Sequence, residues 1–173
     1  SGLSGVTAVA GGAYHTVALK SDGTVWTCGR NHASQLGDGT NTDRTTPVQV
    51  SGLSSVTAVA GGSYHTIALK SDGTVWAWGY NGYNGLGDGT TTNRTTPIQV
   101  SALSGVTAIA GGEYHTIALK SDGTVWAWGS NAYGELGDAT TTQRTTSVRV
   151  SSLSGVIAIA AGYFYTIALK SDG

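Results

Sequence analysis

Three histidines are the first residues in this sequence that could do chemistry. His15, His65 and His115 recur at one position, each directly after a tyrosine. Histidine can bind a metal or move a proton. Except at a central axis, however, equivalent residues of neighbouring repeats lie too far apart for the roughly 2 Å ligand distances of a metal. Tyr165 also replaces the histidine in the fourth copy. We therefore predict hydrogen-bonded structural histidines, with no metal and no cofactor.

Aspartates form a second recurring pattern. Asp22 and Asp72 lie in Ser-Asp-Gly elements, and Asp38 and Asp88 lie in Gly-Asp-Gly elements. None of them has the alternating Asp/Asn spacing of a calcium-binding loop, so the sequence predicts turn residues that accept backbone hydrogen bonds. Asp88 also stands six residues before Arg94, and this spacing recurs in each full repeat. It predicts an ion pair that fixes the loop.

The motifs of familiar enzyme classes do not occur in the chain. It has no H-E-x-x-H helix, phosphate-binding loop or G-x-S-x-G elbow, and no carboxylate pair with a matching base. The single cysteine, Cys28, stands where the next two repeats have Trp78 and Trp128, and we expect it to be a small buried apolar residue. We predict that the protein is not an enzyme.

These residues sit in a repeat with a constant period of 50 residues. The chain of 173 residues divides into full repeats 1–50, 51–100 and 101–150 and a partial repeat 151–173. In the three full repeats, 32 of the 50 positions are identical. A fixed period without insertions predicts one supersecondary unit per repeat, and such units bury their apolar faces by stacking. We therefore treat 1–173 as a single repeat array.

Each repeat is expected to contribute four short antiparallel strands. In the second repeat, these strands cover residues 56–60, 65–70, 75–78 and 97–100, with a long loop over 80–96. The pair Gly61-Gly62 predicts a turn with positive φ, and Ser71 to Thr74 predicts a second tight turn. Four short antiparallel strands in roughly fifty residues form one blade of a β-propeller. The fold class is therefore all-β, with about three and a half blades. Within a blade, Trp76 of the third strand is the ring that we expect to be buried between blades.

The charge of the chain excludes several classes of partner. Charged residues make up 11% of the sequence and the net charge is −1. The chain therefore has no basic footprint for nucleic acid and no patch for an anionic membrane. No run approaches the roughly 18 apolar residues of a membrane span. We expect neither nucleic acid nor membrane as a partner.

The repeat resembles that of the regulator of chromosome condensation (RCC1) family over the entire chain. The resemblance rests on Gly-Gly-x-Tyr-His-Thr-Ile-Ala-Leu-Lys-Ser-Asp-Gly-Thr-Val-Trp-Ala-Trp-Gly-x-Asn, followed by x-Leu-Gly-Asp-Gly-Thr and Pro-x-x-Val. It implies an RCC1-like β-propeller, usually with seven blades. Relatives include an exchange factor for a small GTPase, β-lactamase inhibitor proteins, a plant photoreceptor and secreted bacterial proteins. The resemblance therefore favours a secreted or cell-surface bacterial location.

Positions that differ between near-identical repeats are the candidate binding surface. They gather after the Gly-Gly pair and in the loop that follows the third strand. Tyrosine, arginine and asparagine with glycine is a composition typical of binding surfaces. Neutral drift of exposed loops is the alternative explanation. The predicted contact residues are Arg30, His32, Tyr80, Tyr83, Asn84, Glu113, Tyr133 and Glu135.

Three functions remain open on the sequence. The first is a non-catalytic scaffold that binds another protein through its variable blade loops. The second is a self-assembling structural or designed repeat protein, in which two or more chains close one propeller. The third, nucleotide exchange on a GTPase, is disfavoured because near-identical blades leave little room for one asymmetric footprint. Light sensing is not expected, because the photoreceptor motif Gly-Trp-Arg-His-Thr is replaced, for example by Gly-Ala-Tyr-His-Thr.

The blade count makes a homodimer or larger ring the expected assembly. An arc of three and a half blades leaves the outer faces of its first and last blades open. Two chains would supply seven repeats' worth of residues. Because each chain carries four first half-repeats and three second half-repeats, such a ring needs a shared seam. Alternatively, 173 residues are a piece of a longer chain.

Overall fold

Short β-strands and connecting loops make up the chain. The computed structural model describes residues 3–173, and fourteen strands are found there. The strands are β1 (Val6–Gly11), β2 (His15–Lys20), β3 (Val25–Gly29), β4 (Arg44–Gln49), β5 (Val56–Gly61), β6 (His65–Lys70), β7 (Val75–Gly79), β8 (Arg94–Gln99), β9 (Val106–Gly111), β10 (His115–Lys120), β11 (Val125–Gly129), β12 (Arg144–Arg149), β13 (Val156–Ala161) and β14 (Thr166–Lys170).

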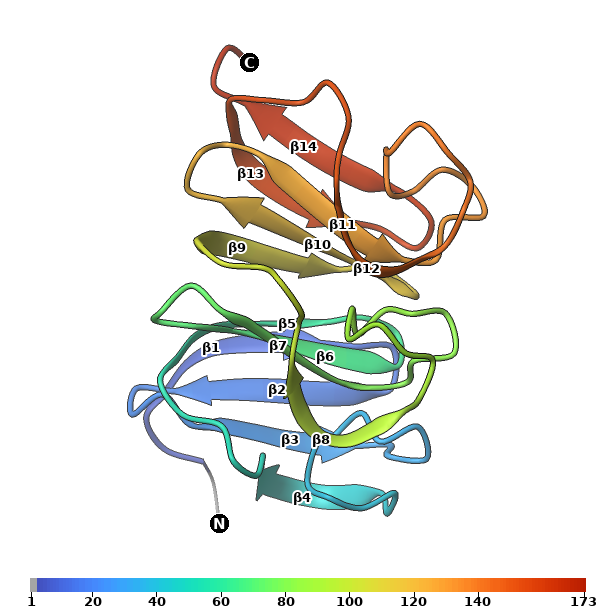
Figure 1. The fold of residues 1–173 in the computed structure, drawn as a ribbon. Coiled ribbons are helices and arrows are strands. Elements are labelled where there is room, and N and C mark those ends of the chain that lie inside the picture. The colour runs from blue at the N-terminus through green and yellow to red at the C-terminus, as the bar shows by residue number, and fades with distance from the viewer. Residues whose placement is uncertain (1–2) are drawn as a thin grey trace.

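The strands form three four-stranded antiparallel meanders and one two-stranded hairpin. The sheet orders are β1-β2-β3-β4, β5-β6-β7-β8 and β9-β10-β11-β12, and the hairpin is β13-β14. We call these sheets blades 1 to 4. Figure 1 shows the blades following one another from the N-terminus to the C-terminus, with the two termini at opposite ends of the arc. The prediction of an all-β propeller of about 3.5 blades is confirmed.

The predicted strands are found, with shifts at their ends. The first and third strands of the second repeat extend to Gly61 and Gly79. The fourth strand was predicted to begin at Pro97, but it begins at Arg94 and ends at Gln99. Gly79 pairs with Arg94, so the ladder starts before the proline. Pro97 is tolerated there because β8 is the edge strand of its sheet.

The inner strands approach one another very closely, and this explains the Gly-Gly pairs. The prediction of a positive φ at these glycines is wrong, because neither Gly61 nor Gly62 has one. A Cβ on Gly62 would instead lie 2.1 Å from Cε1 of His65 and 2.7 Å from the carbonyl oxygen of Gly112. Glycine is needed because of this close approach of side chain and backbone, whereas Gly73 in the next turn does have a φ of 77°.

Apolar side chains between adjacent blades form the core. Val17, Leu19 and Val25 of blade 1 pack in one cluster with Ala68 and Trp78 of blade 2. The same kind of cluster joins blade 2 to Trp128 of blade 3. Both faces of a middle blade are therefore covered, and all residues of β6 from His65 to Leu69 are buried.

The structure corrects which tryptophan is buried between blades. From the sequence, Trp76 was the candidate, but Trp76 is half-buried and Trp78 has no exposed surface. Trp76 packs at the rim of the core, where Nζ of Lys70 lies 5.4 Å from the centroid of its ring. Cys28, expected to be buried, is half-buried and free.

Candidate functional site

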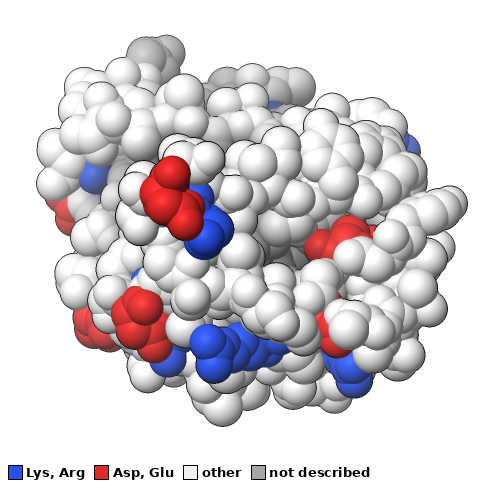
Figure 2. Space-filling model, turned by 90° about the horizontal axis from the view of Figure 1, so that it is seen from above, with Lys and Arg blue, Asp and Glu red and all other residues white. Residues whose placement is uncertain are grey.

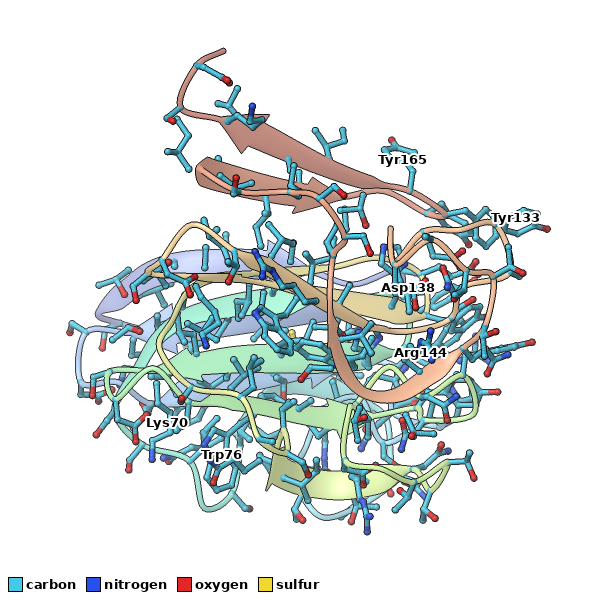
Figure 3. All side chains as sticks on the ribbon, turned by 45° about the horizontal axis from the view of Figure 1, so that its top comes forward. Lys70, Trp76, Tyr133, Asp138, Arg144 and Tyr165 are labelled. Atoms are coloured by element: carbon cyan, nitrogen blue, oxygen red, sulfur yellow. The ribbon has the colours of Figure 1, made fainter. Side chains whose placement is uncertain are left out.

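The variable loops and the Gly-Gly-x-Tyr segments share one end of every blade. Residues at the start of a second strand pair with residues at the end of a third strand, as in the pair His65 and Gly79. The loop that begins at residue 80 therefore emerges beside Tyr64, and the Tyr80 amide donates to the Tyr64 carbonyl over 2.9 Å. Figure 3 shows the two ends, with Tyr133, Asp138 and Arg144 at one and Lys70 and Trp76 at the other.

A fully buried asparagine shapes each of these loops. Nδ2 of Asn81 donates to Asp88 over 3.0 Å and to the carbonyl of Thr90 over 2.9 Å, and Oδ1 accepts from the amide of Leu86 over 3.1 Å. Asn31 and Asn131 make the equivalent bonds. The sequence analysis did not single out this asparagine, although its identity in all three full repeats was a visible signal.

The predicted ion pairs brace the same loops. The Arg94 guanidinium lies 2.5 Å from Asp88, and the equivalent pairs Arg44–Asp38 and Arg144–Asp138 are present. The carboxylates are nearly buried and the arginines are about one-third exposed. Although burial opposes the shift, hydrogen bonds from Thr140 and Arg144 lower the pKa of Asp138 to about 2. The aspartates also accept backbone amides in the turns, as predicted.

The braced loops carry a group of aromatic side chains. We define the tyrosine face by Tyr14, Tyr64, Tyr80, Tyr83, Tyr114, Arg30 and His32. The Tyr64 ring is the centre of the group: it stacks at 5.9 Å and 4° on Tyr114, and its centroid lies 5.2 Å from Tyr14 and 6.2 Å from Tyr80. Rings from all three full blades are thus joined into one surface.

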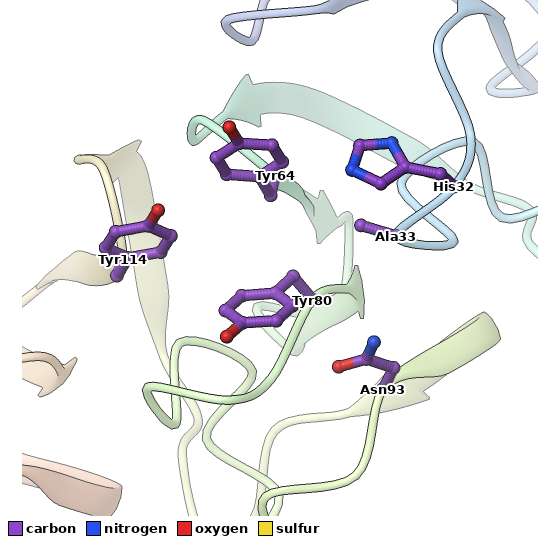
Figure 4. Close-up of a pocket in the computed structure, with 6 residues that line it drawn as sticks. All are labelled: His32, Ala33, Tyr64, Tyr80, Asn93 and Tyr114. Carbon is purple, nitrogen blue, oxygen red and sulfur yellow. The ribbon is translucent and has the colours of Figure 1, made fainter.

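A shallow pocket lies in the tyrosine face. It has a volume of about 280 Å³ and is lined by His32, Ala33, Tyr64, Tyr80, Asn93 and Tyr114. Figure 4 shows these residues around the opening, with rings from blades 2 and 3 and His32 from blade 1. The lining combines flat apolar ring surfaces with hydroxyl, imidazole and amide groups. Such a lining can make apolar and hydrogen-bonded contacts to another molecule.

Among the residues that define the tyrosine face, Arg30 is the only arginine or lysine, and none is an aspartate or glutamate. A hydrogen bond with Tyr14 raises the pKa of Tyr64. Burial of the Tyr114 phenol, together with the negative charge of the nearby Glu113 carboxylate, raises the pKa of Tyr114. Both phenols therefore stay protonated near neutral pH. Elsewhere, Figure 2 shows charged side chains in small separate groups of both signs on the face seen from above.

Five of the eight predicted contact residues lie at the surface. Arg30, His32, Tyr80 and Tyr83 are brought together in the tyrosine face, where the Arg30 guanidinium carbon lies 5.3 Å from the centroid of the Tyr14 ring. Tyr133 is 73% exposed and packs against Phe164 instead, with 5.0 Å between their ring centroids.

The other three predicted contact residues are buried and hold the loops together. Asn84 donates to the Gln143 side chain of the next blade over 3.0 Å. Glu135 accepts from the Ser130 hydroxyl and from the Tyr133 amide, each over 2.8 Å. The Glu113 side chain is 8% exposed, and its backbone amide donates to the next blade. The prediction that these three contact a partner directly does not fit their burial.

Sequence reasoning missed the tyrosines that do not vary. Tyr14, Tyr64 and Tyr114 occur in every full repeat and so are not among the candidate contact residues, which were chosen by their variation, yet Tyr14 is 47% exposed and the other two are half-buried on the face. The available signal was an aromatic residue immediately after a tight Gly-Gly-x segment, where a large side chain can reach the blade end.

The histidines are hydrogen-bonded, as predicted, and their partners lie in the neighbouring blade. Nε2 of His15 lies 2.8 Å from Oγ1 of Thr66, and this hydroxyl donates to the carbonyl of Gln35 over 2.8 Å. The hydroxyl must then accept from the imidazole, so the proton is on Nε2. Burial lowers the pKa of His15 to about 4. Residues 3–173 contain no group of three metal-binding side chains.

The described residues contain no helix that could cross a membrane. They also hold a second shallow cavity of about 270 Å³, lined mainly by the Gly-Gly pairs along the inner strands, as at Gly12, Gly62 and Gly112. Its lining offers few side chains for chemistry.

Comparison with known proteins places the fold. Human WBSCR16 is 25% identical, with a TM-score of 0.86 over 96% of this chain and 44% of that protein. Prp20p from Saccharomyces cerevisiae is 19% identical, with a TM-score of 0.87 over 99% of this chain and 46% of that protein. The computationally designed Ika4 protein is 18% identical, with a TM-score of 0.53 over 100% of this chain and 89% of that protein.

The chain thus spans less than half the length of WBSCR16 and of Prp20p. No curated protein sequence matches it. The family model of the RCC1-like domain matches residues 1–173, which is the whole sequence. The chain belongs to the RCC1-like domain family.

Proposed function

We propose that this chain is a non-catalytic protein-binding module that recognises its partner through the tyrosine face. The observation that carries the proposal is the joined set of partly exposed rings of Tyr14, Tyr64, Tyr80, Tyr83 and Tyr114, which spans three blades. Tyrosine supplies a large contact area with little loss of side-chain entropy, and it is enriched at energetically important contacts.

The rigid support of the face favours the same function. Asn81, Asp88 and Arg94 fix the loop that carries Tyr80 and Tyr83. A preorganised surface loses little conformational entropy when it binds. Prp20p, which shares the fold, binds Gsp1p and histones. That likeness supports a protein partner for this chain without identifying one.

Affinity capture with two matched variants tests the proposal. Tyr80→Ser and Gln99→Arg each introduce the residue that the third repeat has at the same position, Ser130 or Arg149. Proteins captured from the source cells by wild type and variants are quantified by mass spectrometry. Loss of a captured protein with Tyr80→Ser but not with Gln99→Arg supports binding at the face. Equal capture by all three contradicts it. A nucleotide-release assay on a small GTPase tests exchange activity separately.

Self-association of the arc is the second candidate, and the exposed apolar side chains of β14 favour it. Ile167 and Leu169 are 54% and 49% exposed, whereas Ile67 and Leu69 at the same positions of blade 2 are 0% and 5% exposed. An exposed apolar strip of this kind favours association. Light scattering measures it: a mass of two chains or more supports a shared ring, and a stable single-chain mass of 17.5 kDa contradicts it.

A further inference from the structure

The rings of the tyrosine face are arranged in a row rather than around a single point. Those of Tyr14, Tyr64 and Tyr114 follow one another across three blades, with 5.2 and 5.9 Å between successive centroids. The rings of Tyr80 and Tyr83 flank one end of the row, with centroids 5.8 and 4.5 Å from that of Tyr114. An extended segment can contact several of these rings in turn, whereas a small molecule would contact only those around the pocket.

The pocket in this face offers hydrogen-bond donors, and none of its lining residues is an aspartate, glutamate, lysine or arginine. The one side-chain carbonyl in the lining, Oδ1 of Asn93, already accepts from the amide of Asn81 over 2.8 Å. The Asn93 side chain is exposed, and its Nδ2 makes no hydrogen bond within residues 3–173. The N–H groups of Asn93 and the hydroxyl of Tyr80 therefore remain for a ligand that supplies acceptors.

Proline-rich segments have the matching chemistry. Proline has no N–H, and the polyproline II helix has no internal hydrogen bonds, so its carbonyls are acceptors without competing donors. Its pyrrolidine rings are apolar and dock on aromatic side chains, and the helix is largely preformed before it binds. Other modes of peptide recognition fit this face less well, because an amphipathic helix needs an apolar groove and a phosphorylated motif needs several arginines.

Arg30 adds a preference for negative charge at the blade 1 end of the row. Its guanidinium carbon lies 5.3 Å from the centroid of the Tyr14 ring. Within residues 3–173, Arg30 is exposed and forms no ion pair, whereas Arg44, Arg94 and Arg144 each pair with an aspartate. The N–H groups of Arg30 are therefore free for a carboxylate of another molecule.

We propose that the tyrosine face binds a proline-rich extended segment of its partner, with an acidic residue beside the prolines. The proline rings pack on the row of tyrosines, Nδ2 of Asn93 donates to a carbonyl of the segment, and Arg30 pairs with the acidic side chain. This inference rests on the proposed function, because it names the chemistry of the partner that the face recognises.

Three dye-labelled peptides test the proposal by fluorescence anisotropy with the full chain. The first has a glutamate at each end of about eight prolines, which span roughly 25 Å as a polyproline II helix. The second has lysines in place of the glutamates, and the third has alternating glycine and serine in place of the prolines. The first should bind at least ~10-fold more tightly than the third and roughly 3-fold more tightly than the second. Equal binding of the first and third peptides would overturn the proposal.

Variants taken from other repeats test the two polar contacts. Asn93→Asp introduces the residue of the first repeat, where Asp43 still accepts from the amide of Asn31 over 2.6 Å. It keeps the bond that fixes the loop but removes the N–H donors, so both proline peptides should bind at least ~5-fold more weakly. Because one peptide is acidic and the other basic, weakening of both separates the lost donor from the added charge. Unchanged binding of both peptides would rule out the contact with Asn93.

The matched control for this loop is Thr91→Asn, which introduces the exposed residue Asn41 of the first repeat and should change binding by less than ~3-fold. Arg30→Ser introduces the residue of the third repeat, Ser130, and should abolish the preference for glutamate over lysine. A preference that persists in Arg30→Ser would overturn the assignment of Arg30.

The capture experiment distinguishes failure of this inference from failure of the proposed function. If Tyr80→Ser loses a captured protein, but the first peptide binds wild type no better than the glycine–serine peptide does, the face binds a partner and the proline inference is wrong. If Tyr80→Ser captures the same proteins as wild type, while the first peptide still depends on Asn93, the proposed function is wrong and the proline site remains. Competition of the first peptide with the captured protein supports both.

Discussion

The interfaces between blades and the loop face are built from the same repeat, but they differ in how constant their residues are from one repeat to the next. At the interfaces, Trp78 and Trp128 donate to equivalent carbonyls over 3.0 and 2.9 Å, and Thr66 and Thr116 donate to the same carbonyls, each over 2.8 Å. At the loop face, one position holds arginine, tyrosine or serine in successive repeats.

The difference follows from how each position is surrounded. An interface residue is enclosed by two blades, so a change of volume or of donor is felt on both sides. A loop position such as Tyr80 rests on a frame fixed by Asn81, Asp88 and Arg94, and its own side chain is partly in solvent. At the interfaces, repetition therefore marks residues that hold the arc together, whereas the loop face combines repeated tyrosines such as Tyr64 with positions such as 80 that vary between repeats.

Removing an interface tryptophan should have the largest effect on stability. Trp78→Ala leaves a cavity between blades 1 and 2 and removes a donor from the Gln35 carbonyl. We expect a loss of about 3 to 5 kcal/mol in the free energy of unfolding. Urea unfolding measures it, with Trp76→Ala as a control that should cost less because that ring is half-buried. An equal or larger loss for Trp76→Ala would reverse the assignment.

A side chain at Gly62, where the inner strands lie very close together, should cause the second-largest loss of stability. Gly62→Val places side-chain atoms against the His65 ring and the Gly112 carbonyl, and the backbone cannot move away easily. We expect a loss of about 3 kcal/mol, at the upper end of overpacking effects. Gly52→Ala is the matched control, since Ala102 and Ser152 already occupy its position with a similar φ. If thermal melts gave Gly52→Ala a lower melting temperature than Gly62→Val, the steric explanation would be wrong.

Acid should weaken the interfaces before it affects the loops. Burial, with smaller contributions from His115 and His15, lowers the pKa of His65 to about 3. Between that pKa and the unfolded value of about 6.5, the unfolded chain binds more protons, so stability falls as the pH falls. From pH 7 to about 4.5, we expect a loss of about 2 kcal/mol for each of His15 and His65, whose pKa values are lowered to about 4 and about 3. Urea unfolding of His65→Asn should show a shallower pH dependence, and an unchanged slope would disprove the assignment.

Truncation on the loop face should have the smallest effect. Tyr83 is 41% exposed, and Ala33 occupies its position in the first repeat. Tyr83→Ala should therefore change the free energy of unfolding by less than about 1 kcal/mol, mainly through the lost ring contact with Tyr114. If Tyr83→Ala lost as much free energy of unfolding as Trp78→Ala in the same urea titration, the tyrosine face would be part of the core.

The sequence predicted the features that depend on local pattern or on the repeat. The strands, the turn at Asp72 and the ion pair of Asp88 with Arg94 follow from spacing within one repeat. The histidines were predicted to be hydrogen-bonded, but their partner in the next blade was not predicted. The choice between Trp76 and Trp78 could not be predicted, because the two residues lie two positions apart and share one face of the strand. Alternation therefore does not say which of the two rings is enclosed by the next blade.

The candidate site was predicted in part for the same reason. Variation identified Tyr80 and Tyr83, but it also selected Glu135, whose carboxylate is turned inward to the Ser130 hydroxyl and the Tyr133 amide. It passed over Tyr64, which is shared by all full repeats and yet is central to the face. Exposure of a side chain depends on neighbouring blades, and spacing within one repeat does not contain that information.

The most direct test of the account measures stability and binding on one protein, the double variant Tyr80→Ser, Tyr83→Ala. Both substitutions introduce residues that the same framework holds in another repeat, Ser130 and Ala33. Urea unfolding and quantitative affinity capture are performed on the same preparation. We predict a change of less than about 1 kcal/mol in the free energy of unfolding, together with loss of the proteins that wild type captures. A large loss of stability, or unchanged capture by a stable variant, would contradict the assignment of Tyr80 and Tyr83 to a binding face that is separate from the stabilising framework.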